Sequence, residues 1–353
     1  MDSGPSGAAP SGPTLHDVAR EAGVSVATAS RALNGSTRNV RSENAARVRA
    51  AAARLGYRPH LSAQAIARGT TRTVALVVGD VDDPYFAALA AGVTREAEQA
   101  GLIVTMAVAD RSPERELELV RRLRGQRPRV IVVAGSRIAG TRTRDLLVAE
   151  LSEHRTAGGR VALISQPDLP FPTVSLDNHG GARRLAHALL GLGYRRFAVL
   201  RAPERVRTSA ERCSGFLAGL RESGLDVGRP VVIEADFTRA GGHAAAGALL
   251  RRGHGDVQAI FAVNDVMAIG AMTALRGAGV VPGRELAVAG FDDIGSAIDV
   301  VPPLTSVAVP LVEAGAQAMR LALSGDGAAA RALVPARVVL RASTPGPPAP
   351  SAP

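Results

Sequence analysis

The chain has 353 residues, 46% of them hydrophobic, which is long enough for two domains that each bury a core. The formal net charge of +10 points to an acidic partner, and nucleic acid is the usual one. One cysteine, Cys213, excludes an internal disulfide and a cysteine-based zinc finger, and no apolar run is long enough for a transmembrane helix or a signal peptide. We therefore expect a cytoplasmic protein in which Cys213 is a buried thiol.

Positive charge is concentrated near the N-terminus. All 42 basic residues are arginine, a bias that is also typical of a GC-rich coding background, so the total charge says little by itself. Residues 1–70 hold half of the excess, with nine arginines against four acidic residues. Residues 1–13 and 345–353 consist mainly of Gly, Pro, Ser and Ala and are predicted to be disordered tails.

The stretch "TLHDVAREAGVSVATASRALNG", residues 14–35, contains two short helical patterns. Thr14 and Asp17 have the spacing of a capping box at the start of the first helix. Gly23 permits a tight turn, and Ser25 is a suitable N-cap for the second helix. The spacing therefore predicts two helices joined by a short turn.

A third helix is predicted from Ser42 to Leu55, with Gly56 as its stop. In the second helix, Ala29 and Leu33 are expected to face Val18. The expected core positions are Leu15, Val18, Ala19, Ala22, Ala29, Leu33, Ala46, Val48 and Leu55. Together the three helices predict a helix-turn-helix whose second helix has the size of a major-groove reader.

The second helix begins with small side chains, which let its backbone approach the edges of DNA bases. Val26 and Ala27 offer apolar contact to a thymine methyl group. Arg31 has the reach for guanine or phosphate, whereas Thr28 and Ser30 suit phosphate oxygens. A small helical bundle without a DNA role is the alternative interpretation, and the local positive charge argues against it.

From Thr73 onward, short β-branched runs alternate with amphipathic stretches. The runs begin near residues 74, 103, 130, 161, 197, 231, 259 and 286. Helix-length stretches such as Tyr85 to Ala100 and Asn178 to Leu192 separate them. Apolar runs joined by helices predict parallel sheets built from βαβ units. Their number suits two doubly wound halves better than one barrel, although the pattern alone does not exclude a barrel.

Sequence motifs of enzymes are missing from this region. No Gly-x-Gly-x-x-Gly follows the first strand, and a chain without lysine has no Walker-type Gly-Lys-Ser/Thr. Neither G-x-S-x-G nor HExxH is present. The seven histidines have no metal-ligand spacing and are expected at the surface. We therefore predict a protein that is not an enzyme and uses no cofactor or metal.

The segments "TLHDVAREAGVSVATASRALNG", "ARLGYRP" and "TRTVALVV" resemble the LacI/GalR family of bacterial transcriptional regulators, and the likeness runs from Thr14 to Thr344. It implies an N-terminal all-α helix-turn-helix headpiece and an α/β periplasmic-binding-protein-like effector domain with two doubly wound parallel-sheet lobes. The implied boundaries are a tail over 1–13, a DNA-binding domain over 14–58, a hinge helix and linker over 59–72, an effector-binding and dimerisation domain over 73–344, and a tail over 345–353.

The resemblance also implies how the head binds DNA. The Val26–Ala27 pair is typical of members that bind operators with a central CG step, and Ile66 stands where the family inserts an apolar wedge into the minor groove. Ser62 departs from the usual Leu or Val of the hinge, and a plain linker is the alternative for this segment. The complete predicted DNA-binding set is Thr14, Leu15, Ser25, Val26, Ala27, Thr28, Ser30, Arg31, Asn34, Tyr57, Ala63 and Ile66.

The resemblance further implies ligand positions in the two-lobed region. Arginine, amide and carboxylate groups would bind the hydroxyls of a polyol, and aromatic side chains would cover its apolar face. The implied effector-binding residues are Asp83, Tyr85, Phe86, Ser136, Ser165, Arg212, Phe237, Asn264 and Asp292. Alternatively, Asn264 is only a helix N-cap, and Phe86 and Phe237 are ordinary core residues. Arg212 has no acidic partner at helical spacing, but a partner from elsewhere in the fold would make it part of a structural ion pair.

Two positions depart from the family's ligand pattern. Ser165 replaces a usual aspartate, and Val309 replaces a usual glutamine. These losses indicate a less polar, altered or absent effector.

The resulting functional prediction is a homodimeric repressor of carbohydrate-utilisation genes. It would bind double-stranded operator DNA and a sugar or sugar derivative, without a membrane and without a tetramerising tail, and would be nucleoid-associated when bound. A sugar-binding protein without a regulatory role is the alternative. The direction of regulation, the effector and the target genes stay open.

Overall fold

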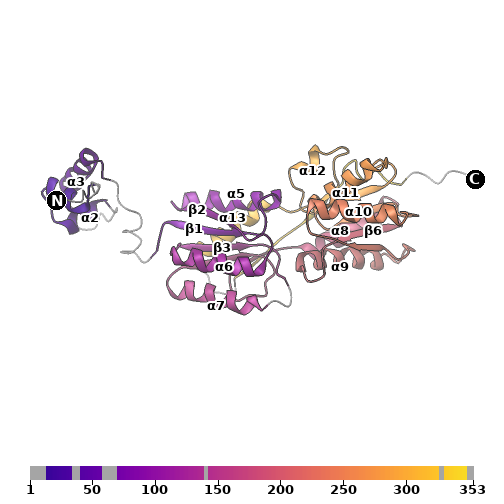
Figure 1. Cartoon of the computed structure of the whole chain (residues 1–353), viewed down its shortest axis with the longest axis horizontal. Helices are drawn as coiled ribbons and strands as arrows, with labels where there is room; N and C mark the ends of the chain where they lie inside the picture. Colours follow the sequence, from indigo (N-terminus) through magenta and orange to yellow (C-terminus); the bar gives the residue numbers. More distant parts are fainter. Residues whose placement is uncertain (1–12, 34–39, 58–69, 139–141, 326–329, 348–353) are drawn as a thin grey trace, which may run out of the picture. The chain divides into compact units, whose positions relative to one another are not determined.

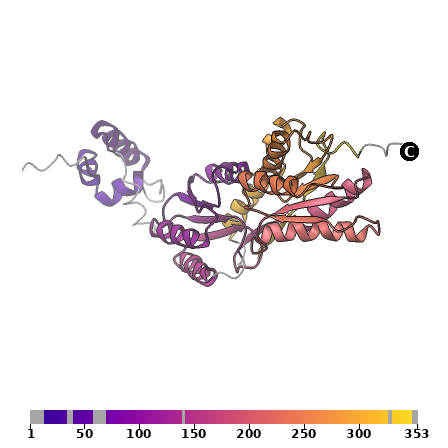
Figure 2. The same cartoon turned by 45° about the vertical axis from the view of Figure 1, so that its right-hand side comes forward.

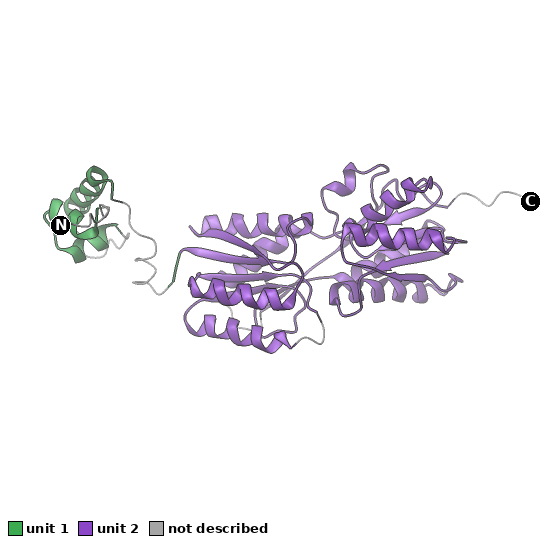
Figure 3. Cartoon of the chain, viewed as in Figure 1, with its two compact units in different colours: residues 1–71 green, residues 72–353 purple. Residues whose placement is uncertain are grey.

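The computed structural model describes residues 13–33, 40–57, 70–138, 142–325 and 330–347. The chain forms two compact units, residues 1–71 and residues 72–353 (Figure 3). We call them the head and the effector unit and describe each by itself. No helix in the described ranges is long and apolar enough to cross a membrane.

The described residues of the head form three helices, α1 (Leu15–Glu21), α2 (Val26–Leu33) and α3 (Ser42–Leu55). As the sequence predicted, Thr14 and Asp17 form a reciprocal capping box at the start of α1. Gly23 has a φ of +62° in the turn between α1 and α2, a conformation that costs glycine little. Gly56 ends α3 in the left-handed conformation.

The core of the head confirms most of the expected positions and corrects two. Ala46 is exposed, and Ala51 and Ala52 of α3 are buried in its place beside Val48. Val26, expected to point outward, is half-buried and packs against the same core. The remaining core residues are Val18, Ala19, Ala22 and Ala29, with Leu15, Val24, Ala32, Leu33, Leu55 and Tyr57 packed against them.

In its described residues, the effector unit has two open parallel sheets and a small antiparallel pair, and these do not close into one barrel. In the first lobe, six parallel strands lie in the order β11-β5-β4-β3-β1-β2. In the second lobe, four parallel strands lie in the order β7-β6-β8-β9, beside an antiparallel pair of β10 and β12. The eight predicted strands are all present, and β5, β10, β11 and β12 are additional.

The strands of the first lobe are β1 (Thr73–Val78), β2 (Ile103–Val108), β3 (Val130–Ala134), β4 (Arg160–Ile164), β5 (Thr173–Leu176) and β11 (Arg331–Val334). Those of the second lobe are β6 (Phe197–Arg201), β7 (Val231–Glu234), β8 (Ala259–Ala262), β9 (Ala287–Ala289), β10 (Ser306–Ala308) and β12 (Arg337–Val339).

Helices cover both faces of each sheet (Figures 1 and 2). On the first sheet they are α5 (Pro84–Gln99) and α13 (Leu311–Ser324) on one face, and α6 (Pro113–Gly125) and α7 (Thr143–Thr156) on the other. The second lobe holds α8 (Asn178–Gly191), α9 (Arg207–Glu222), α10 (Arg239–Arg251), α11 (Asp265–Gly277) and α12 (Ser296–Asp299).

Strand β1 shows why the predicted strands are continuous runs of apolar residues. Val74, Leu76 and Val78 are buried in the cluster that includes α5. Ala75 and Val77 are buried on the opposite face, in the cluster that includes α6 and α7. Because both faces of a parallel sheet are covered, every position of such a strand is apolar.

The chain crosses between the lobes three times, after β5, before α13 and after β11. Its C-terminal segment differs from the expected tail. Residues 345–347 belong to the described part, and the Gly346 backbone N–H donates to the Tyr194 hydroxyl at 3.0 Å. Cys213 is buried, as predicted.

One histidine also corrects the sequence interpretation. His154, on α7, is only 3% exposed, whereas the histidines were expected at the surface. Burial is the main reason that its pKa falls to about 4, and the nearby Arg124 charge adds to the effect. The imidazole therefore occupies the core in its neutral form.

Candidate DNA-binding head and ligand-binding cleft

The N-terminus of α2 has the cap that the sequence predicted. The Ser25 hydroxyl accepts a hydrogen bond from the Thr28 backbone N–H at 3.1 Å and lies 2.8 Å from the Thr28 hydroxyl. Ala27 and Arg31 lie one turn apart and are exposed, and Arg31 Nε donates to the Ala27 carbonyl at 3.1 Å. The helix thus presents a small side chain beside a long cation, a surface suited to approaching base edges.

Other residues of the predicted DNA-binding set have structural roles in the head. Thr14 is engaged in the capping box, and its hydrogen bonds lower the pKa of Asp17. Leu15 and Tyr57, like Val26, pack against the head core. Ser30 is half-buried on α2. Asn34, Ala63 and Ile66 lie outside the described residues.

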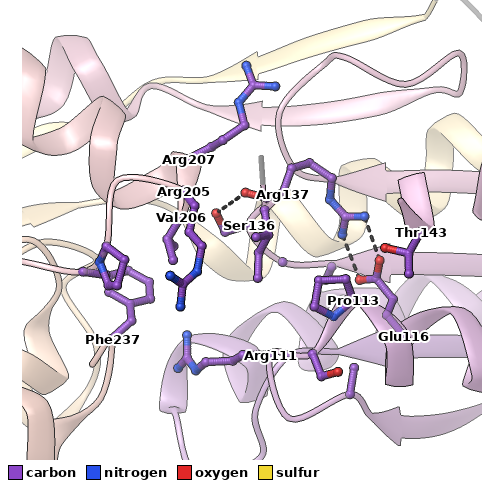
Figure 4. A pocket seen from close by; sticks show the side chains of 18 of the residues that line it. Arg111, Pro113, Glu116, Ser136, Arg137, Thr143, Arg205, Val206, Arg207 and Phe237 are labelled. Carbon is purple, nitrogen blue, oxygen red and sulfur yellow. Dashed lines mark hydrogen bonds and ion pairs between the residues drawn. The ribbon is translucent and has the colours of Figure 1, made fainter. Parts of the chain in front are cut away.

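A cavity of about 540 Å³ lies between the two lobes of the effector unit (Figure 4). It is lined by residues that follow the carboxyl ends of strands from both lobes, including Gly79, Ala109 and Gly135 from the first and Ala202 and Asp236 from the second. Ligands of open α/β sheets bind at this edge, because the βα turns and the N-termini of the helices meet there. Its volume is that of a small-molecule site.

Three of the predicted effector residues line this cavity: Phe86, Ser136 and Phe237. The two rings come from opposite lobes, and both lie near the Arg111 guanidinium, whose carbon is 5.7 Å from the centre of the Phe86 ring and 5.2 Å from that of Phe237. Ser136 accepts a hydrogen bond from the Thr208 backbone N–H at 3.0 Å, so it also joins the lobes.

The other six predicted effector residues do not line the cavity. Asp83 caps α5 and pairs with Arg111 at 3.0 Å. Tyr85 stacks edge-on against Phe86, and burial raises the pKa of its hydroxyl. Ser165 donates to the Gly135 carbonyl at 2.7 Å and accepts from Arg137.

Arg212 and Asp292 bind each other. Both are almost fully buried, and the two guanidinium nitrogens lie 2.7 and 3.1 Å from the two carboxylate oxygens. Arg212 also donates to Asn178 at 2.9 Å and to the Val263 carbonyl at 2.9 Å, and it lies 3.9 Å above the Phe291 ring. Burial raises the pKa of the Asp292 carboxyl to about 6, and the Arg212 charge opposes that rise.

At the junction of β8 and α11, polar side chains are likewise engaged by groups of the protein itself. The Asn264 side chain accepts from the Met267 backbone N–H at 3.0 Å, which makes Asn264 the N-cap of α11. The neighbouring Asp265 is fully buried and accepts from the Ile294 N–H and the Ser306 hydroxyl. Burial, together with the nearby Asp292 charge, raises the pKa of Asp265 well above its usual value.

Sequence reasoning missed Gln166, which joins the two lobes by side-chain hydrogen bonds. It is 3% exposed, accepts from the Arg137 N–H at 2.9 Å, and donates to Thr208 at 3.0 Å and to Glu211 at 3.3 Å across the cleft. Glu211 in turn accepts from Asn178 at 2.9 Å. A hydrogen-bonded chain therefore connects Gln166 to the buried pair of Arg212 and Asp292.

Arg111 was missed as well, because an arginine after a strand carries no local signal for a site. It pairs with Asp80 and Asp83. Its φ of +56° follows a φ of +49° at Asp110, and two consecutive left-handed residues that are not glycine are uncommon. Such strain is concentrated at binding sites, where surrounding contacts hold it.

A helix-turn-helix head, in one chain with a two-lobed module that encloses a ligand-sized cleft, defines a transcriptional regulator and not an enzyme. Comparisons with known proteins agree with this class. Residues 14–60 match the family described as "Bacterial regulatory proteins, lacI family", and residues 186–344 match the periplasmic binding protein-like domain.

Among curated proteins, the transcriptional regulator GalS of Salmonella typhimurium (strain LT2) is 36% identical over 88% of this chain and 89% of its own. Two solved structures are also similar. The lac repressor dimer bound to operator and the anti-inducer ONPF has a TM-score of 0.80 at 25% identity, covering 95% of this chain and 99% of that one. The complex of the regulator CelR with cellobiose has a TM-score of 0.68 at 29% identity, covering 94% and 99%. The chain belongs to the lacI family of bacterial regulatory proteins.

Proposed function

We propose that the protein is a homodimeric repressor of carbohydrate-utilisation genes whose operator affinity is set by a small sugar-like effector. In this proposal residues 14–58 bind DNA, residues 59–72 form a hinge, and residues 73–344 bind effector and dimerise in the cytoplasm. The observation that carries it is the interlobe cavity at the carboxyl ends of the strands, in the same chain as a helix-turn-helix.

Sugar chemistry is supported by the cavity wall and by a relative. Phe86 and Phe237 provide apolar surface for a sugar ring, and Ser136 provides a hydroxyl. The structurally similar CelR binds cellobiose. Effector binding changes the operator affinity only by the difference between its affinities for the two lobe arrangements.

Dimerisation is supported by exposed apolar side chains of the effector unit. Strand β2 is an edge strand whose Ile103 and Met106 are 66% and 46% exposed. Ile298 on α12 and Val301 after it are 59% and 78% exposed. Exposed apolar groups on an edge strand favour association with a second copy, and sedimentation equilibrium would measure it.

The test of regulation is selection of bound duplexes from a random DNA library by the purified full-length protein. A short palindrome with a central CG step is expected, because two heads related by two-fold symmetry bind two half-sites. Repeating the selection with a panel of sugars identifies the effector class. If no palindrome is enriched, operator recognition is refuted. A palindrome whose binding no sugar changes retains the DNA function and refutes the sugar-like effector.

A further inference from the structure

The wall of the interlobe cavity is rich in arginine. Its charged residues are Arg111, Arg137, Arg144, Arg205 and Arg207 on the basic side, and Glu116, Asp168 and Asp236 on the acidic side. The arginines are contributed by both lobes, so an occupant held by them would bridge the cleft.

Neighbouring carboxylates engage two of these arginines. Arg137 forms a two-pronged pair with Glu116 at 2.8 and 2.9 Å, which commits it to the wall. Arg207 pairs with Asp168 through Nη1 at 2.7 Å, and in Figure 4 its side chain points away from the centre of the cavity. Arg207 is therefore set aside because of its direction.

Arg205 is different, since it has no ion pair or side-chain hydrogen bond within the described part of the chain. Figure 4 shows its guanidinium pointing toward that of Arg111 across the cavity, with Phe237 beside them. Arg111 uses Nε and Nη2 for Asp80 and Asp83, which leaves Nη1 without a partner among the described residues. Asp80 and Asp83 compensate the charge of Arg111, whereas Arg205 has no such partner in the described ranges, and an anion between the two groups would accept hydrogen bonds from both.

Helix N-termini add positive potential to the same wall. The cavity is lined by Ser112 and Pro113 at the start of α6, by Val206 and Arg207 at the start of α9, and by Thr238 at the start of α10. The aligned peptide dipoles place partial positive charge at these ends. Asp236, also in the wall, is exposed and carries a negative charge, and its carboxylate can accept hydrogen bonds from the hydroxyl groups of a ligand.

We propose that the effector is an acidic sugar whose oxyanion, a carboxylate or a phosphate, binds between Arg111 and Arg205. This proposal rests on the assignment of the cavity as the effector site and specifies the chemical class of its ligand. The apolar face of the sugar packs on Phe237, and the oxyanion links the two lobes, because Arg111 belongs to the first and Arg205 to the second. The free energy of that link favours the closed arrangement.

The test compares neutral and acidic forms of one sugar on the full-length protein. Galactose, galacturonate, galactose 6-phosphate, the corresponding glucose set and inorganic phosphate alone are measured by calorimetry and thermal shift. We expect phosphate and at least one acidic sugar to stabilise the protein, with the acidic form binding at least 10-fold more tightly than its neutral counterpart. The carboxylate and phosphate members distinguish the two sources of the oxyanion. Raising the salt concentration should weaken acidic ligands selectively.

Arg205→Gln is the decisive variant, because Arg205 is exposed and its loss leaves the fold intact. It should weaken acidic ligands by about 10- to 100-fold and leave neutral sugars unchanged. The matched control is Arg252→Gln. Arg252 is exposed at the C-terminal end of α10, whereas the start of that helix lines the cavity. The control should change the affinity for neither acidic nor neutral sugars. The proposal is overturned if neutral sugars bind as tightly as acidic ones, if Arg205→Gln has no selective effect, or if neither phosphate nor any acidic sugar binds. Operator selection without ligand is unaffected by these outcomes, so it tests the DNA function separately.

Discussion

The Arg212 guanidinium and the Asp292 carboxylate are paired in the core of the second lobe, which is the structural ion pair that the sequence left open as the alternative to an effector role for Arg212. Their atoms lie 2.7 and 3.1 Å apart, and both side chains are almost completely buried. Removing one partner from such a pair leaves an unpaired buried charge, which is the costly event. Each of the two side chains therefore depends on the other for its place in the core.

Arg212→Met should lower the free energy of unfolding by about 3–5 kcal/mol, because Asp292 loses its counter-charge. Adding Asp292→Asn should recover much of this loss, since asparagine tolerates the φ of +110° at this position. Urea denaturation measures both. The control is Glu118→Gln in the exposed pair with Arg122, expected to cost less than about 0.5 kcal/mol. Equal costs at the two sites would mean that the buried pair is hydrated.

Gln166→Ala should loosen the contact between the lobes. The variant loses the hydrogen bonds to Thr208 and Glu211, each worth about 0.5–1.5 kcal/mol. The Thr208 and Arg207 backbone N–H groups donate across the cleft, so their hydrogen exchange reports lobe separation. We expect exchange there to accelerate by roughly 5- to 150-fold, the factor for a loss of about 1–3 kcal/mol. Gln126→Ala, at an exposed helix end, should leave it unchanged, and unchanged exchange in Gln166→Ala would contradict a bridging role.

Arg31→Ala should weaken operator binding with little effect on the stability of the head, because the side chain is exposed. A loss of about 1–3 kcal/mol confined to certain bases would indicate contact with guanine. A loss of affinity that is equal for all DNA sequences would indicate phosphate contact. In that case the slope of log affinity against log salt concentration should also fall by about one. Binding titrations at several salt concentrations distinguish the two. Arg49→Ala on α3 serves as the control, and equal losses in both variants would argue against a specific role for α2.

His154→Leu should make stability less dependent on pH. The pKa of His154 is about 4 in the folded protein and near 6.5 in the unfolded chain, so acid protonates the unfolded chain first. The wild type therefore loses stability as the pH falls from about 6.5 to 4, and the variant should lack this part of the loss. Thermal melts at pH 7, 6 and 5 measure the difference. His243→Leu, at an exposed position, should leave the profile unchanged, and parallel profiles for His154→Leu would contradict a buried neutral imidazole.

Gly92→Ala should destabilise the first lobe. A Cβ at Gly92 on α5 would lie 1.9 Å from the Val312 carbonyl oxygen on α13, so the two helices would have to separate. We expect a loss of about 1–3 kcal/mol or more in urea denaturation. Gly125→Ala, where no atom lies within 4 Å of the added carbon, should be neutral or slightly stabilising. A neutral Gly92→Ala would mean that the contact between α5 and α13 is loose.

Local signals predicted the regular elements well. The expected helix from Ser42 to Leu55 coincides with α3, and each of the eight predicted strands is present. The additional strand β11 was missed because it is short and pairs with β5, which lies more than 150 residues earlier in the chain. Ala46 was misassigned to the core because helical periodicity alone did not determine which face of α3 packs against α1 and α2.

The candidate site was less accessible to sequence reasoning. Phe86, Ser136 and Phe237 line the cavity as the family pattern implied, while Asn264 caps a helix and Arg212 pairs with Asp292. Arg205 and Gln166 were not singled out, because an exposed arginine and a glutamine after a strand are ordinary in sequence. Their significance depends on groups contributed by the other lobe.

The sequence by itself determined the helix-turn-helix, the parallel α/β region and the positions of eight of its strands along the chain. Each of these is encoded within short windows, by capping residues, by helical spacing and by apolar runs that are buried on both faces. The tertiary structure alone decided which polar groups satisfy one another and which remain available to a ligand. Arg212 and Asp292 are 80 positions apart, and Arg111 and Arg205 belong to different lobes, so their pairing or convergence depends on how the two sheets pack and not on any local pattern.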